Sequence, residues 1–171
     1  MSEPTAATSD PPVPATVARA RWRDLWGVAR MQRRAFRPGL AYNFSALVFL
    51  WLLPTVTFLV ARDGRTGEVR GCCIADRQGG SVRIVNIAVD PVARRRGIAT
   101  ALLRAVTAAL PADEIELIVE EHNEGAQTLY TREGFVRTGF ARDYYGTGRH
   151  GIWMRRRRPT PGAAPRRTID V

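Results

Sequence analysis

The chain has 171 residues, which fits one globular domain and is too short for two domains of ordinary size. Hydrophobic residues make up 45% and charged residues 25%, and this composition excludes a disordered or fibrous protein. All 26 basic residues are arginine, and the net charge of +10 favours an anionic ligand or partner.

The two ends of the chain differ in composition from the middle. Pro, Ser, Thr and Ala dominate residues 1–14, which we expect to be disordered, and we expect a single domain over residues 15–155. Residues 156–171 are predicted to be a flexible basic tail. The N-terminal segment lacks the basic start and the apolar stretch of a signal peptide, so a cytoplasmic protein is expected.

An uncharged run of 17 residues, 44–60, comes close to the length of a membrane span. Pro54 lies inside this run and would break a membrane helix. The run therefore predicts a helix followed by a strand, and no membrane partner is expected. The helix is apolar on all sides, which indicates that its outer face is covered by a second subunit in a homodimer or by an apolar acceptor or peptide.

Hydrophobic periodicity and turn residues predict the first half of the fold. The expected elements are, in chain order, a strand over 16–22, helices over 24–37 and 44–53, and strands over 55–62, 69–77 and 82–89. Asp24 and Asn43 are the expected helix caps. Glycine-containing turns separate the three later strands, so we expect them to form an antiparallel meander.

The second half alternates helices and strands. It contains a helix between Pro91 and Pro111, a strand over 114–121, a short helix that Asn123 caps and that ends at about Arg132, and strands over 135–145 and 150–155. The first of these helices would return the chain, so that the next strand pairs in parallel. The pattern predicts an α/β fold of the α+β type, with a mixed, mostly antiparallel central sheet of about six or seven strands flanked by about four helices.

The two cysteines are adjacent, at positions 72 and 73. Neighbours on a strand point to opposite faces, so we expect reduced thiols and no disulfide framework. No spaced set of cysteines and histidines predicts a metal site, and no metal is expected.

The basic turn from Arg94 to Ala99 follows a predicted strand and opens a predicted helix. The first amides of a helix are unpaired and bind phosphate, and Gly97 lets a ligand come close to the backbone. The turn lacks the Lys and Ser/Thr of a Walker turn and the three glycines of a dinucleotide turn. A tight turn with solvated arginines is the structural alternative.

Three segments together resemble one family. The run 94–99, RRRGIA, resembles the R/Q-x-x-G-x-G/A signature of the GCN5-related N-acetyltransferases, the GNAT superfamily. The run 86–91, NIAVDP, is similar to the fourth strand of that family, and the run 123–135 resembles its N-x-x-A-x-x-L-Y-x-x-x-G-F segment. The runs RDYY at 142–145 and IWM at 152–154 are similar to the bacterial ribosomal-protein-alanine N-acetyltransferase branch.

The resemblance implies an enzyme that moves the acetyl group of acetyl-CoA directly to a primary amine through a tetrahedral intermediate, without a metal. The acceptor would be a protein N-terminus or a lysine. The implied coenzyme contacts are the backbone of Ile87, Ala88 and Val89 for the pantetheine, Arg94, Arg95, Arg96, Gly97, Ile98, Ala99 and Thr100 for the pyrophosphate, and Asn123 for the pantetheine region. The amide of Val89 would also contact the developing oxyanion.

Tyr130 occupies the position at which the family places its general acid. A phenol with a pKa of about 10 stays neutral at pH 7 and can give a proton to a developing thiolate, whose pKa is near about 8.5. The structural alternative is a core tyrosine on an amphipathic helix.

The general base departs from the branch pattern, because Ile118 stands where the branch has a glutamate. Glu116 and Glu120 flank it on the same strand face, and Glu120 is preferred because it is nearer the cleft end of the strand. His122 is a further candidate, and the proton could also go to water and backbone carbonyls with no side-chain base.

The acceptor is predicted from charge. Glutamates gather around the predicted fifth strand, at positions 114, 116, 120, 121 and 124, and are expected to steer a cationic amine there. The alternatives are a small-molecule amine as acceptor, or a non-catalytic CoA-binding or interaction module. The sequence does not favour nucleic acid as a partner, because no aromatic and basic residues interleave in a recognition motif.

Overall fold

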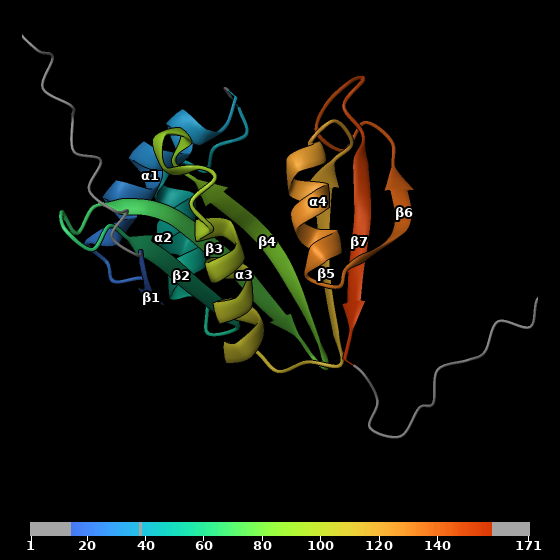
Figure 1. Cartoon of the computed structure of the whole chain (residues 1–171), viewed down its shortest axis with the longest axis horizontal. Coiled ribbons are helices and arrows are strands. Elements are labelled where there is room, and N and C mark those ends of the chain that lie inside the picture. Colours follow the sequence, from blue (N-terminus) through green and yellow to red (C-terminus); the bar gives the residue numbers. More distant parts are fainter. Residues whose placement is uncertain (1–14, 38, 159–171) are drawn as a thin grey trace, which may run out of the picture.

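The structure is a computed structural model that describes residues 15–37 and 39–158. The predicted disordered segment at 1–14 and most of the predicted tail lie outside the described residues. The elements, shown in Figure 1, are β1 (Thr16–Arg19), α1 (Asp24–Ala35), α2 (Phe44–Leu52), β2 (Val56–Arg62), β3 (Val69–Gln78), β4 (Ser81–Val89), the 3-10 turn η1 (Pro91–Ala93), α3 (Ile98–Ala109), β5 (Glu114–Glu120), α4 (Glu124–Arg132), β6 (Val136–Ala141) and β7 (Gly151–Arg157).

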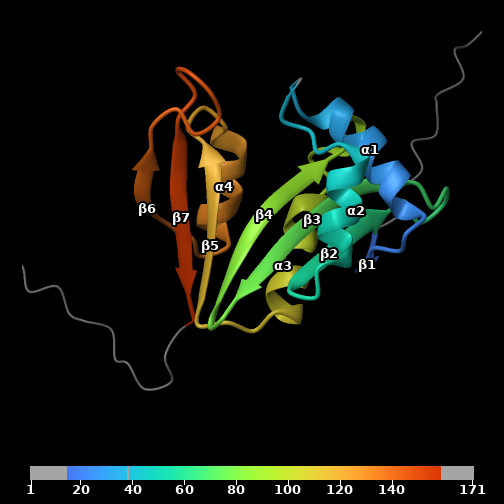
Figure 2. The same cartoon turned by 180° about the vertical axis from the view of Figure 1, so that it is seen from behind.

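The strands form one seven-stranded sheet in the order β1-β2-β3-β4-β5-β7-β6. Every neighbouring pair is antiparallel except β4 and β5, which the crossover through α3 makes parallel. Helices α1 and α2 cover one face of the sheet, and α3 and α4 lie on the other (Figure 2). The predicted fold class is confirmed.

Two hydrophobic cores lie on the two faces of the sheet. Cys72 belongs to the core under α1 and α2, and Cys73 belongs to the core under α3 and α4. Both thiols are free and buried, and burial raises the pKa of Cys72 to about 12. The cysteines are therefore structural core residues on opposite faces, as the alternation predicts.

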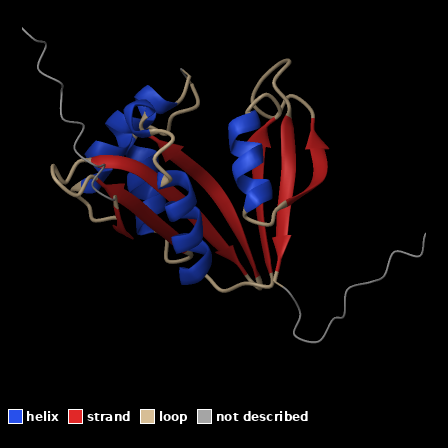
Figure 3. Ribbon diagram, in the orientation of Figure 1, coloured by secondary structure: helices blue, strands red, loops and turns tan. Residues whose placement is uncertain are grey.

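The two central strands separate after a short stretch of pairing. β4 pairs with β5 only from Ser81 to Ile84. The next residue, Val85, is an extra residue in a β-bulge, because Ile74 of β3 pairs with Asn86 and its neighbour Ala75 pairs with Ile84. Beyond the bulge the two strands diverge (Figure 3). A sequence alone does not reveal the bulge, since nothing in the run 81–89 marks it.

Several predicted boundaries change. Asp24 is the first residue of α1 and does not cap it; its carboxylate accepts a hydrogen bond from the Arg21 amide at 2.6 Å and pairs with Arg62. Asn43 and Asn123 cap α2 and α4 as predicted, at 2.8 and 3.2 Å. The predicted strand over 135–145 ends at Ala141, where a turn begins. Strand β7 extends to Arg157, beyond the expected end of the domain.

Helix α2 is covered only on its inner side. Leu47 is fully buried, whereas Phe49 and Leu52 are more than half exposed. Within the described ranges, none of the helices has both the length and the apolar character needed to cross a bilayer.

Candidate active site

The turn between η1 and α3 presents a row of unbonded amides. Arg95 and Gly97 both have left-handed backbone, with φ of 63° and 75°. In the described part of the chain, no group accepts a hydrogen bond from the amides of residues 95–100. Together with the start of α3 they form a concave set of donors, which is the arrangement that binds phosphate.

Helix α3 lies close to the sheet because Gly71 of β3 has no side chain. A Cβ atom there would lie 2.9 Å from Ile98 Cγ2 and 3.1 Å from the Ala88 carbonyl oxygen. The first turn of α3 therefore rests directly on β3 and β4. The motif analysis did not identify Gly71, because its role depends on contacts with residues far along the chain.

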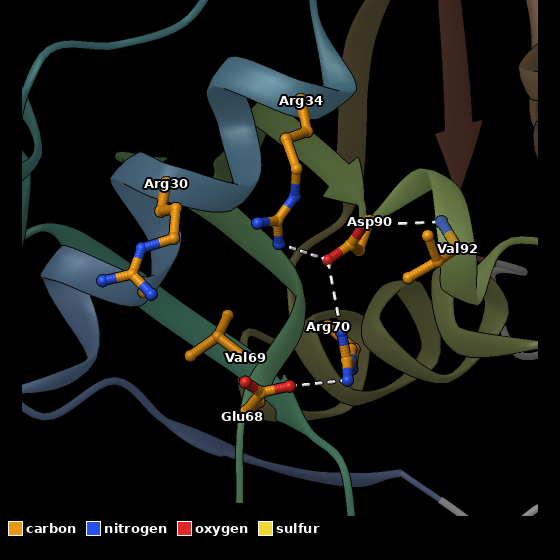
Figure 4. Close-up of a pocket in the computed structure, with 8 residues that line it drawn as sticks. Arg30, Arg34, Glu68, Val69, Arg70, Asp90 and Val92 are labelled. Atoms are coloured by element: carbon orange, nitrogen blue, oxygen red, sulfur yellow. Dashed lines mark hydrogen bonds and ion pairs between the residues drawn. The ribbon is translucent and has the colours of Figure 1, made fainter.

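Asp90 holds the other end of the turn. Its side chain is fully buried and caps η1 by accepting a hydrogen bond from the Val92 amide, at 3.4 Å. The carboxylate also pairs with Arg34 of α1 at 2.6 Å and with Arg70 of β3 at 3.5 Å (Figure 4). Asp90 thus ties the turn to two other elements.

An open pocket of about 360 Å³ lies beside Asp90, between α1 and the start of β3. Figure 4 shows Arg30, Arg34, Glu68 and Arg70 along its walls. Glu68 and Asp90 already pair with the guanidinium groups of Arg70 and Arg34, and no nucleophile lines the pocket. We therefore place the reaction elsewhere, at the point where β4 and β5 separate.

The three consecutive arginines were expected to contact the pyrophosphate, but the side chain of Arg94 is engaged within the protein. Arg94, Arg95 and Arg96 are exposed. Arg94 directs its guanidinium to the Ala35 carbonyl at the end of α1, at 3.1 Å. Its side chain thus anchors the turn to α1, while the side chains of Arg95 and Arg96 extend to solvent.

Tyr130 lies where β4 and β5 begin to diverge. It is buried in the core under α3 and α4, with its ring 5.9 Å from that of Phe135. Burial raises the pKa of its hydroxyl, and Cys73 on β3 and Tyr145 on the opposite side of the sheet raise the pKa further. In the described chain no residue forms a hydrogen bond with this hydroxyl, so its proton is available to a ligand.

Glu120 is engaged by an arginine. Its carboxylate accepts a hydrogen bond from Arg149 Nε at 2.7 Å, and this bond lowers the pKa of Glu120 despite partial burial. A lowered pKa makes a carboxylate a weaker base. The neighbouring Ile118 fits over Gly151 of β7, where a Cβ atom would come within 2.5 Å of Ile118 Cδ1.

The glutamates of β5 do not form the expected negative patch. Glu114 pairs with Arg155 and Arg157, Glu116 lies 3.7 Å from Arg155, and Glu120 pairs with Arg149. The register of β5 with β7 places Arg157 opposite Glu114 and Arg155 opposite Glu116, whereas Arg149 reaches Glu120 from the turn before β7. Arg155 and Arg157 are thus neutralised within the sheet.

Aromatic residues that the sequence analysis did not assign to the site line the side of β5 opposite α4. Tyr145 donates a hydrogen bond to the Ile118 carbonyl at 3.0 Å, and burial raises the pKa of its hydroxyl to about 12. Tyr144 contacts Trp153 edge to face, and Arg83 stacks over Trp153 at 4.9 Å. The only signal in the sequence is two adjacent tyrosines in a turn.

Gln32 connects this side to β4 and was also missed. It is fully buried, donates to Asn86 Oδ1 at 3.2 Å and accepts from the Tyr42 amide at 3.0 Å. Gln32 therefore fixes the α1–α2 loop beside the bulge. A single polar residue on the buried stripe of a helix is the signal that could have identified it.

The two histidines lie apart from Tyr130. His122 is exposed, and His150 accepts a hydrogen bond from the Asp143 amide at 3.0 Å, which holds the turn before β7. Over residues 15–37 and 39–158, the side chains that bind metals do not gather in groups of three or more.

Comparison with known proteins identifies the family. The model of the acetyltransferase (GNAT) domain matches residues 54–137. The uncharacterized N-acetyltransferase MJ1530 of Methanocaldococcus jannaschii is 30% identical over 142 residues, which are 80% of this chain and 88% of that protein. The N-alpha-acetyltransferase MAK3 of Arabidopsis thaliana is 31% identical over 128 residues, which are 72% of this chain and 66% of MAK3.

Solved structures share the fold. The ribosomal-protein-S18-alanine N-acetyltransferase of Escherichia coli superposes with a TM-score of 0.76 at 21% identity, covering 91% of this chain and 99% of that one. Arabidopsis thaliana NAA60, solved with acetyl-CoA, has a TM-score of 0.71 at 20% identity, over 82% and 97% of the two chains. The chain belongs to the GNAT family of acetyltransferases, which confirms the recognition made from its motifs.

Proposed function

We propose that this protein transfers the acetyl group of acetyl-CoA to the α-amino group of a protein or peptide. One arrangement carries the proposal. Strand β4 loses its pairing with β5 after Ile84 and leads into the turn at residues 94–99, whose amides lack hydrogen-bond acceptors. Tyr130 lies near the point at which β4 and β5 separate. An extended arm with an anionic end fits these three features together.

The coenzyme would be held by backbone groups. The amides of residues 95–100 are free to receive the pyrophosphate, and the edge of β4 from Ile87 to Val89 has no strand partner on the side of β5. The pantetheine arm would add to this edge as a further strand does. Asn123, whose side-chain oxygen caps α4, keeps its amide nitrogen for the pantetheine region.

The proton transfers are assigned as follows. Tyr130 stays protonated at neutral pH because burial raises its pKa, and its unbonded hydroxyl would donate to the leaving sulfur. The amide of Val89 would stabilise charge on the carbonyl oxygen. Since Glu120 is held by Arg149, the acceptor amine would lose its proton to water. Glu120 would then act only as a positioning residue, by holding Arg149 and the turn before β7 in place.

The acceptor would enter beside the aromatic side chains of Tyr42, Tyr144 and Tyr145. The charged groups at this side are mainly cationic: Arg83 donates to the Tyr144 hydroxyl at 3.3 Å, and Arg37 lies close enough to lower the pKa of Glu120. Peptides with neutral or acidic residues after the first position should therefore be better acceptors than arginine-rich peptides.

Two alternatives follow from particular observations. A small-molecule amine is the alternative acceptor, since a mycothiol acetyltransferase of Clavibacter michiganensis is 36% identical over 88 residues. A non-catalytic CoA-binding module is favoured by the pairing of Glu120 with Arg149 and by Ile118 at the position of the branch glutamate.

An acceptor screen with labelled acetyl-CoA separates these functions. Peptides with varied first and second residues, their N-terminally blocked copies, polyamines and aminoglycosides would be compared between pH 6 and 9, the range in which an α-amino group of pKa about 8 deprotonates. We expect label on unblocked peptides only, at a rate that rises with pH. Label on polyamines or aminoglycosides alone contradicts the peptide acceptor, and coenzyme binding without any transfer contradicts catalysis.

A further inference from the structure

The outer face of α1 and α2 exposes large apolar side chains that the proposed reaction does not use. Their exposed fractions are 65% for Trp22, 59% for Trp26, 62% for Phe49 and 67% for Leu52. We call these four residues the apolar face. They are half of the large hydrophobic side chains that the described chain exposes. Trp26 lies on α1, Phe49 and Leu52 lie on the adjacent helix α2, and Trp22 lies in the turn before α1.

The packing of the two helices brings these residues together. Trp51 of α2 donates to the Ala20 carbonyl, just before α1, at 2.9 Å. At the other end of α2, Phe44 stacks on Trp26 with ring centroids 4.1 Å apart. The helices therefore lie antiparallel on one side of the sheet (Figures 1 and 2). Along the chain, Trp22 lies between Ala20 and Trp26, and Phe49 lies between Phe44 and Trp51.

The charges around the apolar face have one sign. Residues 15–62 contain eight arginines and a single acidic residue, Asp24. Asp24 is buried and paired with Arg62. Arg21, Arg23 and Arg30 are exposed, and in the described structure no carboxylate forms an ion pair with them. The exposed charges of this segment are thus positive, and the nearby Glu68, which lines the pocket beside Arg30, pairs with Arg70.

We propose that the apolar face docks on membranes that contain anionic lipids. Exposed tryptophan, phenylalanine and leucine beside arginines are the composition of helices that lie in the lipid head-group layer. A fluid bilayer accepts protruding side chains without a matching cavity, whereas a protein partner needs one. A second copy of the chain would bring arginines against arginines, which opposes a homodimer through this face.

Docking in this orientation leaves the coenzyme side of the candidate active site accessible. The turn at residues 94–99 leads into α3, and α3 lies on the face of the sheet opposite α1 and α2 (Figure 3). The expectation of no membrane partner rested on the absence of a spanning helix, and a helix pair lying on the surface does not need spanning length. This inference is independent of the proposed acetyl transfer.

The test is co-sedimentation of the full chain with vesicles. Vesicles of phosphatidylcholine alone would be compared with vesicles in which about a third of the lipid is phosphatidylglycerol. We expect binding to the anionic vesicles only, weakened by added salt, with a blue shift of tryptophan emission. Equal binding to both vesicle types, or to neither, overturns the proposal.

Matched variants locate the contact. We expect Trp22→Gln/Phe49→Gln/Leu52→Gln to abolish binding, and Val136→Gln/Phe140→Gln, which alters exposed apolar residues of β6, to leave it unchanged. Reversal of two arginines in Arg23→Glu/Arg30→Glu should weaken binding by about 25-fold or more. The control Arg166→Glu/Arg167→Glu changes the same charge near the C-terminus and should have a clearly smaller effect.

Three results would contradict membrane docking through the apolar face and would identify another cause or another partner. If the control variants lose as much binding as the variants of the apolar face, general positive charge explains the binding and the proposal is wrong. If light scattering detects a dimer that the triple variant dissociates, the apolar face is a contact between two copies. If polyglutamate binds the apolar face and vesicles do not, the partner is an acidic protein.

Discussion

The coenzyme side and the acceptor side of the candidate site meet at β4 and β5 but consist of different chemical groups. On the coenzyme side, backbone amides and an unpaired strand edge face the ligand. Gly71 sets how closely α3 approaches the sheet, and Gly97 supplies the left-handed backbone of the turn. On the acceptor side, the groups are side chains such as Glu120, Arg149 and Tyr145, which come from separate parts of the chain.

This difference predicts how each side responds to substitution. A backbone site depends on conformation, so it should tolerate changes of exposed arginines and fail when a glycine with positive φ is replaced. A site built from side chains depends on hydrogen bonds and ion pairs between them, so its function should decline stepwise as individual side chains are removed. Each experiment below changes one side and measures whether the other is affected.

The largest overall effect is expected for Gly97→Glu, because an enzyme that does not bind the coenzyme has no activity. Gly97 has a φ of 75°, so a side chain there strains the turn, and a carboxylate would repel the pyrophosphate. Acetyl-CoA affinity measured by calorimetry should fall by at least about 100-fold, or about 2.7 kcal/mol. The matched control is Gly79→Glu in the β3–β4 turn, where φ is 61° and the space is equally open. Equal affinities for the two variants would refute the phosphate site.

Tyr130→Phe tests the point where the two sides meet. Removing the hydroxyl leaves the packing against Phe135 in place, so the fold and coenzyme binding should persist. If Tyr130 supplies the proton, kcat should fall by about 10²–10⁴-fold. The comparison variant is Tyr145→Phe, which loses the bond to the Ile118 carbonyl and should mainly raise the KM for the acceptor. Near-normal kcat in Tyr130→Phe would leave this residue a packing role.

The contrast between the two sides also explains how far sequence reasoning reached. The order of elements, the parallel pair after Pro91 and the caps at Asn43 and Asn123 follow from local periodicity and local hydrogen bonding, and these predictions are confirmed. The turn at 94–99 is equally local, since its glycine and its helix start are contiguous. The bulge at Val85 was not predicted, because it is defined by the register of β4 with β3, which the sequence of β4 alone does not contain.

The acceptor side could not be predicted, because its pairs join residues that are distant in sequence. Arg149 and Glu120 are 29 positions apart, and Arg83 and Tyr144 are 61 apart. Glutamates at alternate positions on a strand look unpaired until the register with β7 places arginines opposite them. Three of the five glutamates that were expected to form a negative patch, at positions 114, 116 and 120, are held in ion pairs.

Asp90→Asn tests whether the coenzyme side depends on anything beyond the backbone. An asparagine can still accept a hydrogen bond from the Val92 amide, but it leaves Arg34 without a counter-charge and leaves Arg70 paired only with Glu68 and Asp63. Because both arginines are partly exposed, we expect a loss of about 2 kcal/mol in the free energy of unfolding and weaker coenzyme binding. Glu68→Gln removes the exposed partner of Arg70 and should cost less than about 0.5 kcal/mol. Equal losses would show that Asp90 has no special role.

The smallest effect is expected for Glu120→Gln, and it depends on pH. Arg149 lowers the pKa of Glu120 in the folded protein below its ordinary value of 4.5, so the pair stabilises the fold above that pH and the stabilisation is lost as the pH falls through the lowered pKa. Both side chains are about one quarter exposed, which limits the gain to about 1 kcal/mol or less. Urea unfolding of the wild type and Glu120→Gln should differ at pH 7 and converge near pH 3, whereas Glu124→Gln, an exposed residue of the next helix, should show no such convergence.

Because Arg149 holds Glu120 as a weak base, we expect the Glu120→Gln variant to lose less than about tenfold in kcat and to change mainly the KM for the acceptor. A loss of about 10²-fold or more in kcat at unchanged stability would instead identify Glu120 as the group that takes the proton.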